Sequence, residues 1–329
     1  MVSKKVLAWL LEENQPSIRY RTLTELMHRP SSDPEVREAR KKITEVGWAA
    51  DILAERNPAG WWVRETNHYQ PKYITTNWKL LVLSDLGLTR ENPAIRESVE
   101  LWTRMRPIPK GEPGQHVPGS FHHCGTGNAT RAMIRFGYAD DPRVREALDW
   151  LVMTANPRGG WSCFSSAHRP ATGRTLDSWE GLSALAEVPR AERSAAMQRS
   201  IELGAEFFLE RELHNQGERY PPWYRFHYPV HYYYDILVGL EILTKLGYGS
   251  DPRLRYGLSL LEEKRRPDGR WNLDAVHPDV KGSSLEARWE TWFKAHPKDR
   301  FIPFGLETPG SPSKMITLRA LLVLDRAAS

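Results

Sequence analysis

Cysteine is nearly absent from this sequence. Only 2 of the 329 residues are cysteines, Cys124 and Cys163. A framework of disulfide bonds therefore does not explain the fold, because such frameworks belong to short, cysteine-dense chains. We expect both cysteines to be free thiols or metal ligands.

The sequence also lacks a long apolar run and a large excess of one charge. The N-terminal stretch MVSKKVLAWLLEENQPS is interrupted by charges, and its apolar run is too short for a signal peptide or for the roughly 20 apolar residues of a membrane span. The 46 basic and 41 acidic residues are mixed along the chain, and the net charge is only +5. We therefore expect a cytoplasmic protein with no transmembrane segment and no nucleic-acid partner.

Four stretches of the sequence begin alike and indicate a helical repeat. They are DPEVREA from Asp33, NPAIRES from Asn92, DPRVREA from Asp141 and DPRLRYG from Asp251. Each has Asp or Asn at an N-cap position, proline at the first helical position and an apolar residue at helical spacing, as α-helices begin. The last separation is about twice the others, so we expect a degenerate copy at 189–194.

A second set of helices is apolar on nearly every face, which predicts that they are buried beneath the charged helices of the repeat. They are RTLTELM (21–27), NWKLLVLSDLGL (77–88), NATRAMIRFGY (128–138), SWEGLSALAEV (178–188), VGLEILTKLGY (238–248) and ITLRALLVLDR (316–326). Six hairpins without polar capping repeats favour a closed ring over an open stack. We predict an all-α fold, an (α/α)6 toroid formed by a single domain at 1–329. The segment 272–313 is a long insertion in the last hairpin and a candidate lid.

Turns that join glycine to an aromatic residue connect the two layers. They are GWW from Gly60, GSF from Gly119, GGWSCF from Gly159 and PDGRW from Pro267. Tryptophan in such a turn is interpreted first as packing between neighbouring hairpins. With the repeat, PDGRWNL and NPRGGWSCF resemble the terpenoid cyclase and protein prenyltransferase superfamily of α/α toroids, whose repeats are of the squalene–hopene cyclase type.

The resemblance implies a central cavity whose mouth is surrounded by the N-termini of the inner helices. Helix N-termini favour anions, including phosphates. Protein prenyltransferases bind zinc with Asp, Cys and His at this end of their toroid, and Zn²⁺ accepts these ligands readily. The resemblance therefore implies a zinc site here, with Cys124, Cys163, His123 and Asp235 as candidate ligands. No CxxC spacing accompanies them, and packing beside a glycine turn is the alternative for the cysteines.

A second chemistry follows from the same resemblance. Class II terpene cyclases protonate an olefin with an aspartic acid of a DxDD motif, and aromatic rings stabilise the resulting carbocations. This sequence has no DxDD. Asp235 is the candidate acid, because burial among the tyrosines of YYYDIL would raise the pKa of its carboxyl. Asp177, at the equivalent position of the neighbouring inner helix, and His231 complete the catalytic candidates.

The candidates for substrate contacts are mostly aromatic. They are Trp61, Tyr73, His122, Trp161, Trp179, Tyr232, Tyr234 and Lys314. We interpret the chain as an enzyme-like protein that acts on an apolar or isoprenoid small molecule by Lewis-acid chemistry with zinc or by general-acid chemistry with aspartate. Two alternatives stay open: a non-catalytic toroidal binding or scaffold protein, and a carbohydrate-active α/α-barrel enzyme with paired carboxylates.

Overall fold

The structure is a computed structural model that describes residues 2–105, 122–162, 173–214, 220–231, 233–276 and 304–328. Within these ranges the regular secondary structure is helical, and strand pairing is limited to two isolated β-bridges. The prediction of an all-α fold is confirmed for the described residues. None of their helices has the length and apolar character needed to span a membrane.

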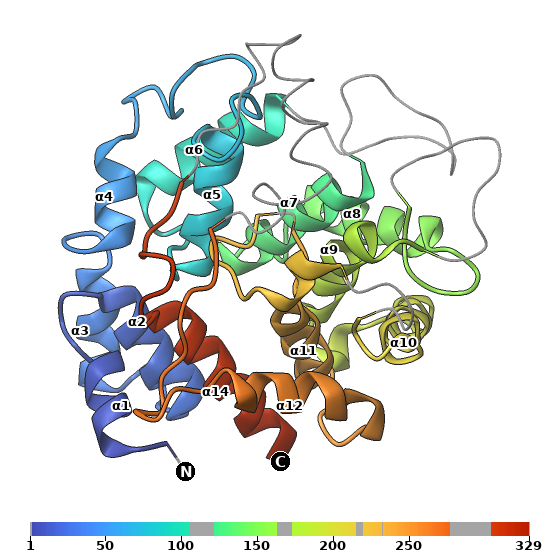
Figure 1. Cartoon of the computed structure of the whole chain (residues 1–329). Helices are drawn as coiled ribbons and strands as arrows, with labels where there is room; N and C mark the ends of the chain where they lie inside the picture. Colours follow the sequence, from blue (N-terminus) through green and yellow to red (C-terminus); the bar gives the residue numbers. More distant parts are fainter. Residues whose placement is uncertain are drawn as a thin grey trace, which may run out of the picture.

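The inner layer is a closed ring of helices (Figure 1). It consists of α2 (Pro16–Arg21) with the π-helical turn η1 (Thr22–Leu26), α5 (Thr76–Asp85), α7 (His123–Arg135), α9 (Thr175–Ala186), α11 (Ile236–Lys245) and α14 (Lys314–Ala328). Each helix from α5 to α14 contacts the next, and α14 contacts α2 and η1. Arg21 also donates a hydrogen bond of 3.4 Å to the carbonyl oxygen of Asp85, which connects α2 with α5.

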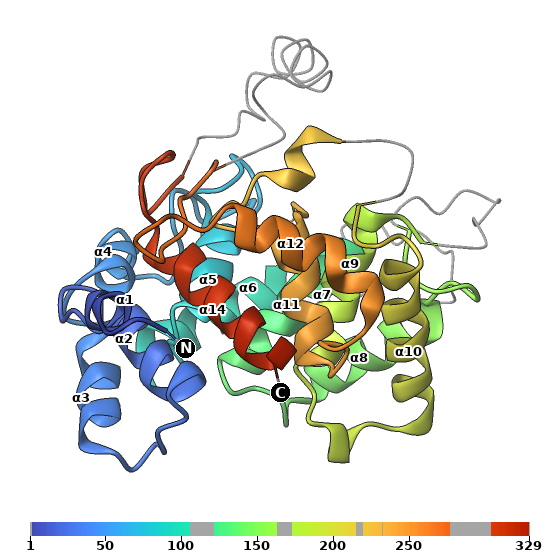
Figure 2. The ribbon, with the colours of Figure 1, turned by 60° about the horizontal axis from the view of Figure 1, so that its bottom comes forward.

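The outer layer surrounds this ring (Figures 1 and 2). It consists of α1 (Lys4–Leu10), α3 (Pro34–Lys42), α4 (Trp48–Ala54), α6 (Pro93–Met105), α8 (Pro142–Thr154), α10 (Ala195–Leu209) and α12 (Arg255–Glu263). Short 3-10 turns are η2 (Arg190–Glu192), η3 (Pro221–Tyr224) and η4 (Pro252–Leu254). The first and last helices lie against each other: Nζ of Lys314 in α14 is 5.5 Å from the ring centroid of Trp9 in α1.

The predicted helix starts are confirmed. Asp33, Asp141 and Asp251 each accept a hydrogen bond from the backbone N–H two residues later. The degenerate copy is also present, since Ser194 caps α10 through the N–H of Met197. Local capping chemistry therefore sets where the outer helices begin.

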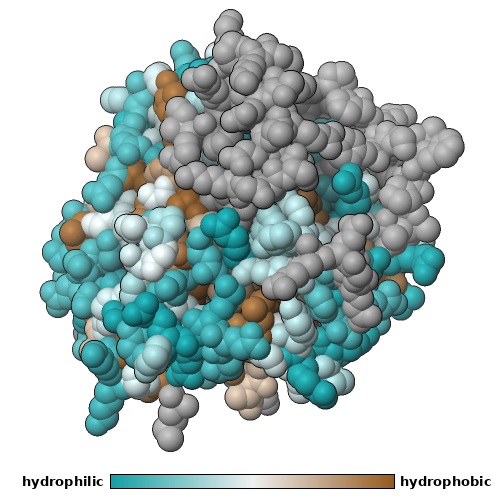
Figure 3. All heavy atoms as spheres, viewed as in Figure 1, coloured by the Kyte–Doolittle hydropathy of each residue, from teal (hydrophilic) through white to brown (hydrophobic). Residues whose placement is uncertain are grey.

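Burial separates the two layers as the sequence predicts. Every residue of α9 from Ser178 to Ala186 is buried, whereas α3 buries only Val36 and Ala39. One cluster of buried apolar residues includes side chains from every inner helix. The described part of the surface in Figure 3 is mostly hydrophilic, so the apolar area of the chain is concentrated between the layers.

Three turns between the layers share one hydrogen-bond pattern. Trp62, Trp161 and Trp271 each donate the indole N–H to the carbonyl ten residues earlier, in the preceding outer helix, at 2.7, 2.9 and 2.7 Å. Their backbone N–H groups donate to a threonine or serine hydroxyl near the start of the next inner helix, at 3.0, 2.9 and 3.0 Å. Each turn thus connects the end of an outer helix to the beginning of an inner helix.

Most of the predicted insertion at 272–313 lies outside the described residues, which do not include 277–303. Its two ends lie side by side, because the N–H of Leu273 donates to the carbonyl of Ser311 at 3.0 Å. The lid stays a prediction.

Candidate functional site

Helical spacing places a series of polar side chains along one face of α7 and one face of α9. The series are Cys124, Asn128, Arg131 and Arg135 on α7, and Asp177, Glu180, Ser183 and Glu187 on α9 and its C-cap. The last two of each series line a cavity at the C-terminal ends of the inner helices. Asn128 and Glu180 therefore lie about one turn nearer to the helix N-termini, on the same faces.

Glu180 is a buried acid without a hydrogen-bond partner among the residues that the structure describes. Its side chain is 0% exposed, and neither carboxyl oxygen has a partner in the described part of the chain. Desolvation is the main reason why the pKa of this carboxyl is raised well above its usual value, and the neighbouring Cys124 and Asp177 raise the pKa further. Glu180 therefore retains its proton at a pH where an ordinary glutamate is ionised.

A close contact between α7 and α9 holds Glu180 in place. A β-carbon at Gly127 would lie only 2.5 Å from the carbonyl carbon of Glu180. Glycine is therefore required at this position, because any side chain would push the helices apart. The segment HHCGTGN is thus a helix entrance that allows a second helix to approach.

An aromatic cluster lies against the same part of α7. The ring of His231 stacks on Tyr73 with centroids 4.8 Å apart and meets the ring of Trp78 edge-on at 5.3 Å. The hydroxyls of Tyr73 and Tyr233 share a hydrogen bond of 2.8 Å. Asn128, the residue after Gly127, donates to the carbonyl oxygen of His231 at 2.9 Å. The cluster is thereby connected to the turn of α7 that contacts the buried acid.

The two stacked residues also share an unusual backbone conformation. Tyr73 has φ +76° and His231 has φ +48°, in the left-handed region that residues other than glycine rarely adopt. Such conformations cost on the order of 1–3 kcal/mol each and persist only where the surrounding structure imposes them. Backbone strain of this kind is enriched at functional sites, which makes the aromatic cluster a candidate wall of the site.

Asp235, the predicted acid, has a different role. Its carboxylate accepts the backbone N–H groups of Val238 at 2.8 Å and His227 at 3.0 Å, and it contacts Nδ1 of His227 at 2.6 Å. Burial raises the pKa of Asp235, but the interactions with His227, Arg319 and Val238 outweigh burial, so the pKa is lowered. The expected increase is therefore wrong, because the capping partners of this carboxylate could not be read from the sequence. Asp235 is the N-cap of α11.

The described members of the predicted zinc set do not converge. His123 stacks on Trp150 of the outer helix α8, with ring centroids 4.6 Å apart. Cys124 is a partly buried residue of α7, and Asp235 is held by its own helix start. Among the described residues, no three His, Cys, Asp or Glu side chains are grouped closely enough to hold a metal ion. Cys163 lies outside these residues, and the zinc site stays a prediction whose described donors do not fit together.

Three predicted substrate contacts have structural partners among the described residues, and their role toward a substrate stays a prediction. Trp161 is fully buried in its turn and packs on Gly181, where a β-carbon would lie 2.9 Å from the indole. Tyr234 donates its hydroxyl to the carbonyl of Leu213 at 2.9 Å. Lys314, the first residue of α14, pairs with Glu12 at 2.7 Å. In each case the polar group has a structural partner that the sequence pattern did not reveal.

Four of the other predicted contacts lie in the described part of the chain, and one of them, Tyr73, belongs to the aromatic cluster. The ring of Trp179 lies 5.1 Å from the guanidinium carbon of Arg131. Trp61 is half-buried, and His122 is exposed at the N-cap position of α7. Tyr232 lies outside the described residues.

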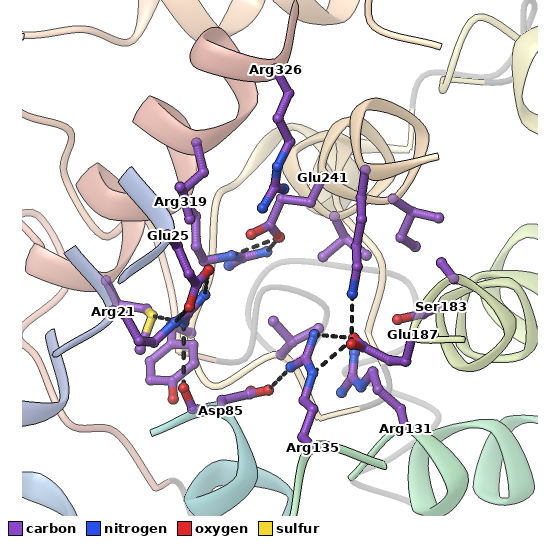
Figure 4. Close-up of a pocket in the computed structure, with 18 residues that line it drawn as sticks. Arg21, Glu25, Asp85, Arg131, Arg135, Ser183, Glu187, Glu241, Arg319 and Arg326 are labelled. Atoms are coloured by element: carbon purple, nitrogen blue, oxygen red, sulfur yellow. Dashed lines mark hydrogen bonds and ion pairs between the residues drawn. The ribbon is translucent and has the colours of Figure 1, made fainter. Parts of the chain in front are cut away.

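A charged cavity of about 100 Å³ lies where the inner helices end (Figure 4). It is lined by the cations Arg21, Arg131, Arg135, Lys245, Arg319 and Arg326 and by the acids Glu25, Asp85, Glu187 and Glu241. This cavity was not among the predictions. The sequence indicates it only through charged residues inside helices that are otherwise apolar, as in ATRAMIR and GLEILTK.

Comparisons with known proteins give only remote structural likenesses. The sequence matches no protein-family model, and no curated protein matches it. A protein from Actinoplanes has a TM-score of 0.44 and 17% identity, over 95% of this chain and 90% of its own. The type II terpene cyclase MstE from Scytonema has a TM-score of 0.33 and 17% identity, over 89% of this chain and 97% of its own. A variant of MstE in complex with geranylgeranyl dihydroxybenzoate gives a TM-score of 0.31 at 17% identity, over 89% of this chain and 96% of its own. The fold and the site described above therefore rest on this chain's own helices and contacts.

Proposed function

We propose that this chain is an enzyme that protonates an apolar, olefin-containing small molecule of the isoprenoid class, with Glu180 as the general acid. The observation that supports the proposal is the buried carboxyl of Glu180, whose pKa is raised and whose oxygens have no hydrogen-bond partner in the described part of the chain. A carboxylic acid kept neutral by an apolar environment is a suitable proton donor at neutral pH. Glu180 thus takes the role of proton donor that was predicted for Asp235.

The proton transfer balances without a further reactant. The O–H bond of Glu180 breaks, the π electrons of the olefin form a new C–H bond, and the neighbouring carbon becomes a carbocation. Attack by a second double bond closes a ring, and loss of a proton from carbon then ends the reaction as an isomerisation. Arg131 favours the carboxylate that Glu180 becomes, because its positive charge lowers the pKa of that group.

The aromatic cluster fits the second half of this reaction. The faces of tyrosine and tryptophan rings attract a positive charge, by about 0.5–2 kcal/mol for each well-placed ring. Tyr73 and Trp78 supply such rings against the turn of α7 that contacts Glu180. Their hydrogen bonds and the stack with His231 fix the orientation of these rings.

The proposal is tested by incubation with farnesol and geranylgeraniol in ²H₂O. A general acid that exchanges with solvent places one deuterium on carbon in each product molecule, and mass spectrometry detects that deuterium. We expect Glu180→Gln to lower the rate of turnover by about 100-fold or more. Glu91→Gln, the same change at a side chain that is 75% exposed, is the matched control and should retain most of the turnover.

Two results would contradict this assignment. One is a Glu180→Gln variant with wild-type turnover. The other is a wild-type protein that consumes both alcohols without placing deuterium on carbon. Circular dichroism of each variant distinguishes loss of chemistry from loss of folding.

A further inference from the structure

The charged cavity at the ends of the inner helices shares only Arg131 with the proposed proton transfer. Its six cationic and four acidic side chains give the lining a net charge of +2. Cations lower the pKa of Glu187 to about 2 and also lower the pKa of Glu25, against the effect of burial, so these two acids remain ionised at neutral pH. The positive surplus is therefore present under physiological conditions.

All four acids are already paired with cations of the same cavity. The pairs are Arg21 with Glu25 at 2.6 Å, Arg319 with Glu241 at 2.5 Å, Lys245 with Glu187 at 2.6 Å, and Arg135 with both Asp85 and Glu187. Arg131 and Arg326 form no ion pair with any acid in the described ranges. These two side chains are the surplus positive charge.

Helix ends explain the position of most of these cations but not that of Arg131. Carbonyl groups at a helix C-terminus attract cations within the last turn, and Arg135 and Lys245 are the last residues of α7 and α11. Arg131 lies one turn inside α7 and rises from the same wall of the cavity as Arg135 (Figure 4). A structural role at the helix end therefore does not account for it.

The guanidinium of Arg131 is buried with an unused donor. The residue is 5% exposed, and its Nε has no hydrogen-bond partner among the described residues. The guanidinium carbon of Arg131 lies 5.1 Å from the ring centroid of Trp179. This contact provides no oxygen acceptor for the N–H groups of Arg131. Desolvation lowers the pKa of Arg131. A buried charged donor without an acceptor is costly, and an anion in the cavity would remove that cost.

A second unused donor lines the same cavity. Tyr228 is 2% exposed, and its hydroxyl has no partner in the described ranges. The cavity volume of about 100 Å³ corresponds to roughly three water molecules at about 30 Å³ each, which is the scale of one tetrahedral oxyanion. The side chains of Arg135 and Lys245 are 30% and 35% exposed, so the cavity is open to solvent at its rim.

We propose that this cavity binds a phosphate group, with Arg131 as the buried anchoring donor. The surplus of two positive charges matches a phosphate dianion, and the planar guanidinium presents the N–H donors that phosphate oxygens accept. The open rim admits either inorganic phosphate or the phosphate end of a small monoester. Arg131 also acts electrostatically on Glu180, but the phosphate site follows from the charges and donors of the cavity itself and does not rest on the proposed enzymatic reaction.

Calorimetric titration with inorganic phosphate, at constant ionic strength in chloride, tests the proposal. We expect saturable binding of one phosphate per wild-type chain and at least a tenfold weaker affinity in Arg131→Gln. The matched control is Arg90→Gln, because Arg90 pairs with the exposed Asp140 at 2.7 Å on the surface. That variant should bind phosphate as the wild type does.

Absence of saturable binding to the wild type overturns the proposal, and so does equal weakening in Arg131→Gln and Arg90→Gln. If Arg131→Gln does not fold, as judged by circular dichroism, Arg326→Gln removes the other surplus charge, and an unchanged affinity in that variant overturns the proposal as well. Titration with phenyl phosphate distinguishes the two sources of the group. Tighter binding of the ester indicates that the natural ligand is the phosphate end of a larger molecule. Binding of inorganic phosphate but not of the ester indicates that the natural ligand is the free ion.

Discussion

At the scale of single residues, two buried carboxyl groups show that burial alone does not determine a pKa. Asp235 and Glu180 are both 0% exposed. Asp235 accepts two backbone N–H groups and contacts His227, and its pKa is lowered. Glu180 accepts no hydrogen bond within the described residues, and its pKa is raised. Electrostatic and hydrogen-bond interactions with His227, the charge of Arg319 and the hydrogen bond from Val238 therefore outweigh burial at Asp235, whereas burial dominates at Glu180.

Glu180→Gln should stabilise the protein at high pH. Because the folded state holds this proton more tightly than the unfolded chain, the stability associated with Glu180 is complete below its ordinary pKa of 4.5 and is lost as the pH rises toward the raised value. Glutamine has no such titration. We expect the free energy of unfolding to rise at pH 8 and to change less at pH 4. Urea unfolding at pH 8 and pH 4 measures the difference, and an equal effect at both pH values would contradict it.

Asp235→Asn should have the opposite pH dependence. The lowered pKa of Asp235 means that its contribution is present above its ordinary pKa of 3.8 and is lost as the pH falls through the lowered value. Replacement of the carboxylate weakens the acceptor of two buried backbone N–H groups and the contact with His227, which costs about 1–3 kcal/mol. We expect a cost of this size at pH 7 that becomes smaller in acid. Asp177→Asn, at a partly exposed position of α9, is the control and should cost less than about 1 kcal/mol.

At the scale of elements, the turn tryptophans explain how outer and inner helices are joined. The sequence predicted both the turns and the packing role of their tryptophans, but it did not predict the shared hydrogen bonds. Trp62, Trp161 and Trp271 use the indole N–H on the outer helix and the backbone N–H on the inner helix. The glycines before them adopt positive φ, which permits the tight turn.

Trp161→Phe tests this connection. The change leaves the buried carbonyl of Leu151 without its indole donor, which should lower the free energy of unfolding by about 1–3 kcal/mol. The loss of packing by the smaller phenylalanine ring adds to this cost. Trp61→Phe is the control, because Trp61 is half-buried in the equivalent turn and should cost about 0.5 kcal/mol or less. Chemical denaturation compares the two variants, and similar costs would show that the indole hydrogen bond contributes little.

At the scale of the whole molecule, the closed ring makes the last inner helix essential to the first. α14 contacts α11 on one side and α2 and η1 on the other. In an open stack, each repeat depends only on its neighbours, so loss of a terminal repeat leaves the others folded. In a ring, that loss exposes the apolar faces of two neighbouring helices.

Deletion of residues 314–329 should therefore abolish cooperative unfolding of the entire chain. We expect the intact protein to unfold in one thermal transition, followed by near-ultraviolet circular dichroism, and the deleted chain to show no such transition. A deleted chain that keeps a cooperative transition with most of the native helix content would favour an open stack instead.

The amino-acid sequence by itself determined the two kinds of helix and the starts of five outer helices, but not the outer helices α1 and α4. This information is local: Asp–Pro pairs set where outer helices begin, and the apolar periodicity of segments such as 178–188 shows that they are buried. It also indicated the mouth of the ring, including Asp177 and Cys124.

Only the tertiary structure decided which of these polar groups have partners. Asp235 was expected to be the acid, yet it caps its own helix, whereas Glu180 is isolated because the glycine at position 127 brings α7 against α9. The charged cavity likewise combines Arg21, Arg131 and Arg319 from distant parts of the chain. Desolvation and ion pairing depend on what surrounds a group in space, and no spacing along a single chain contains that information.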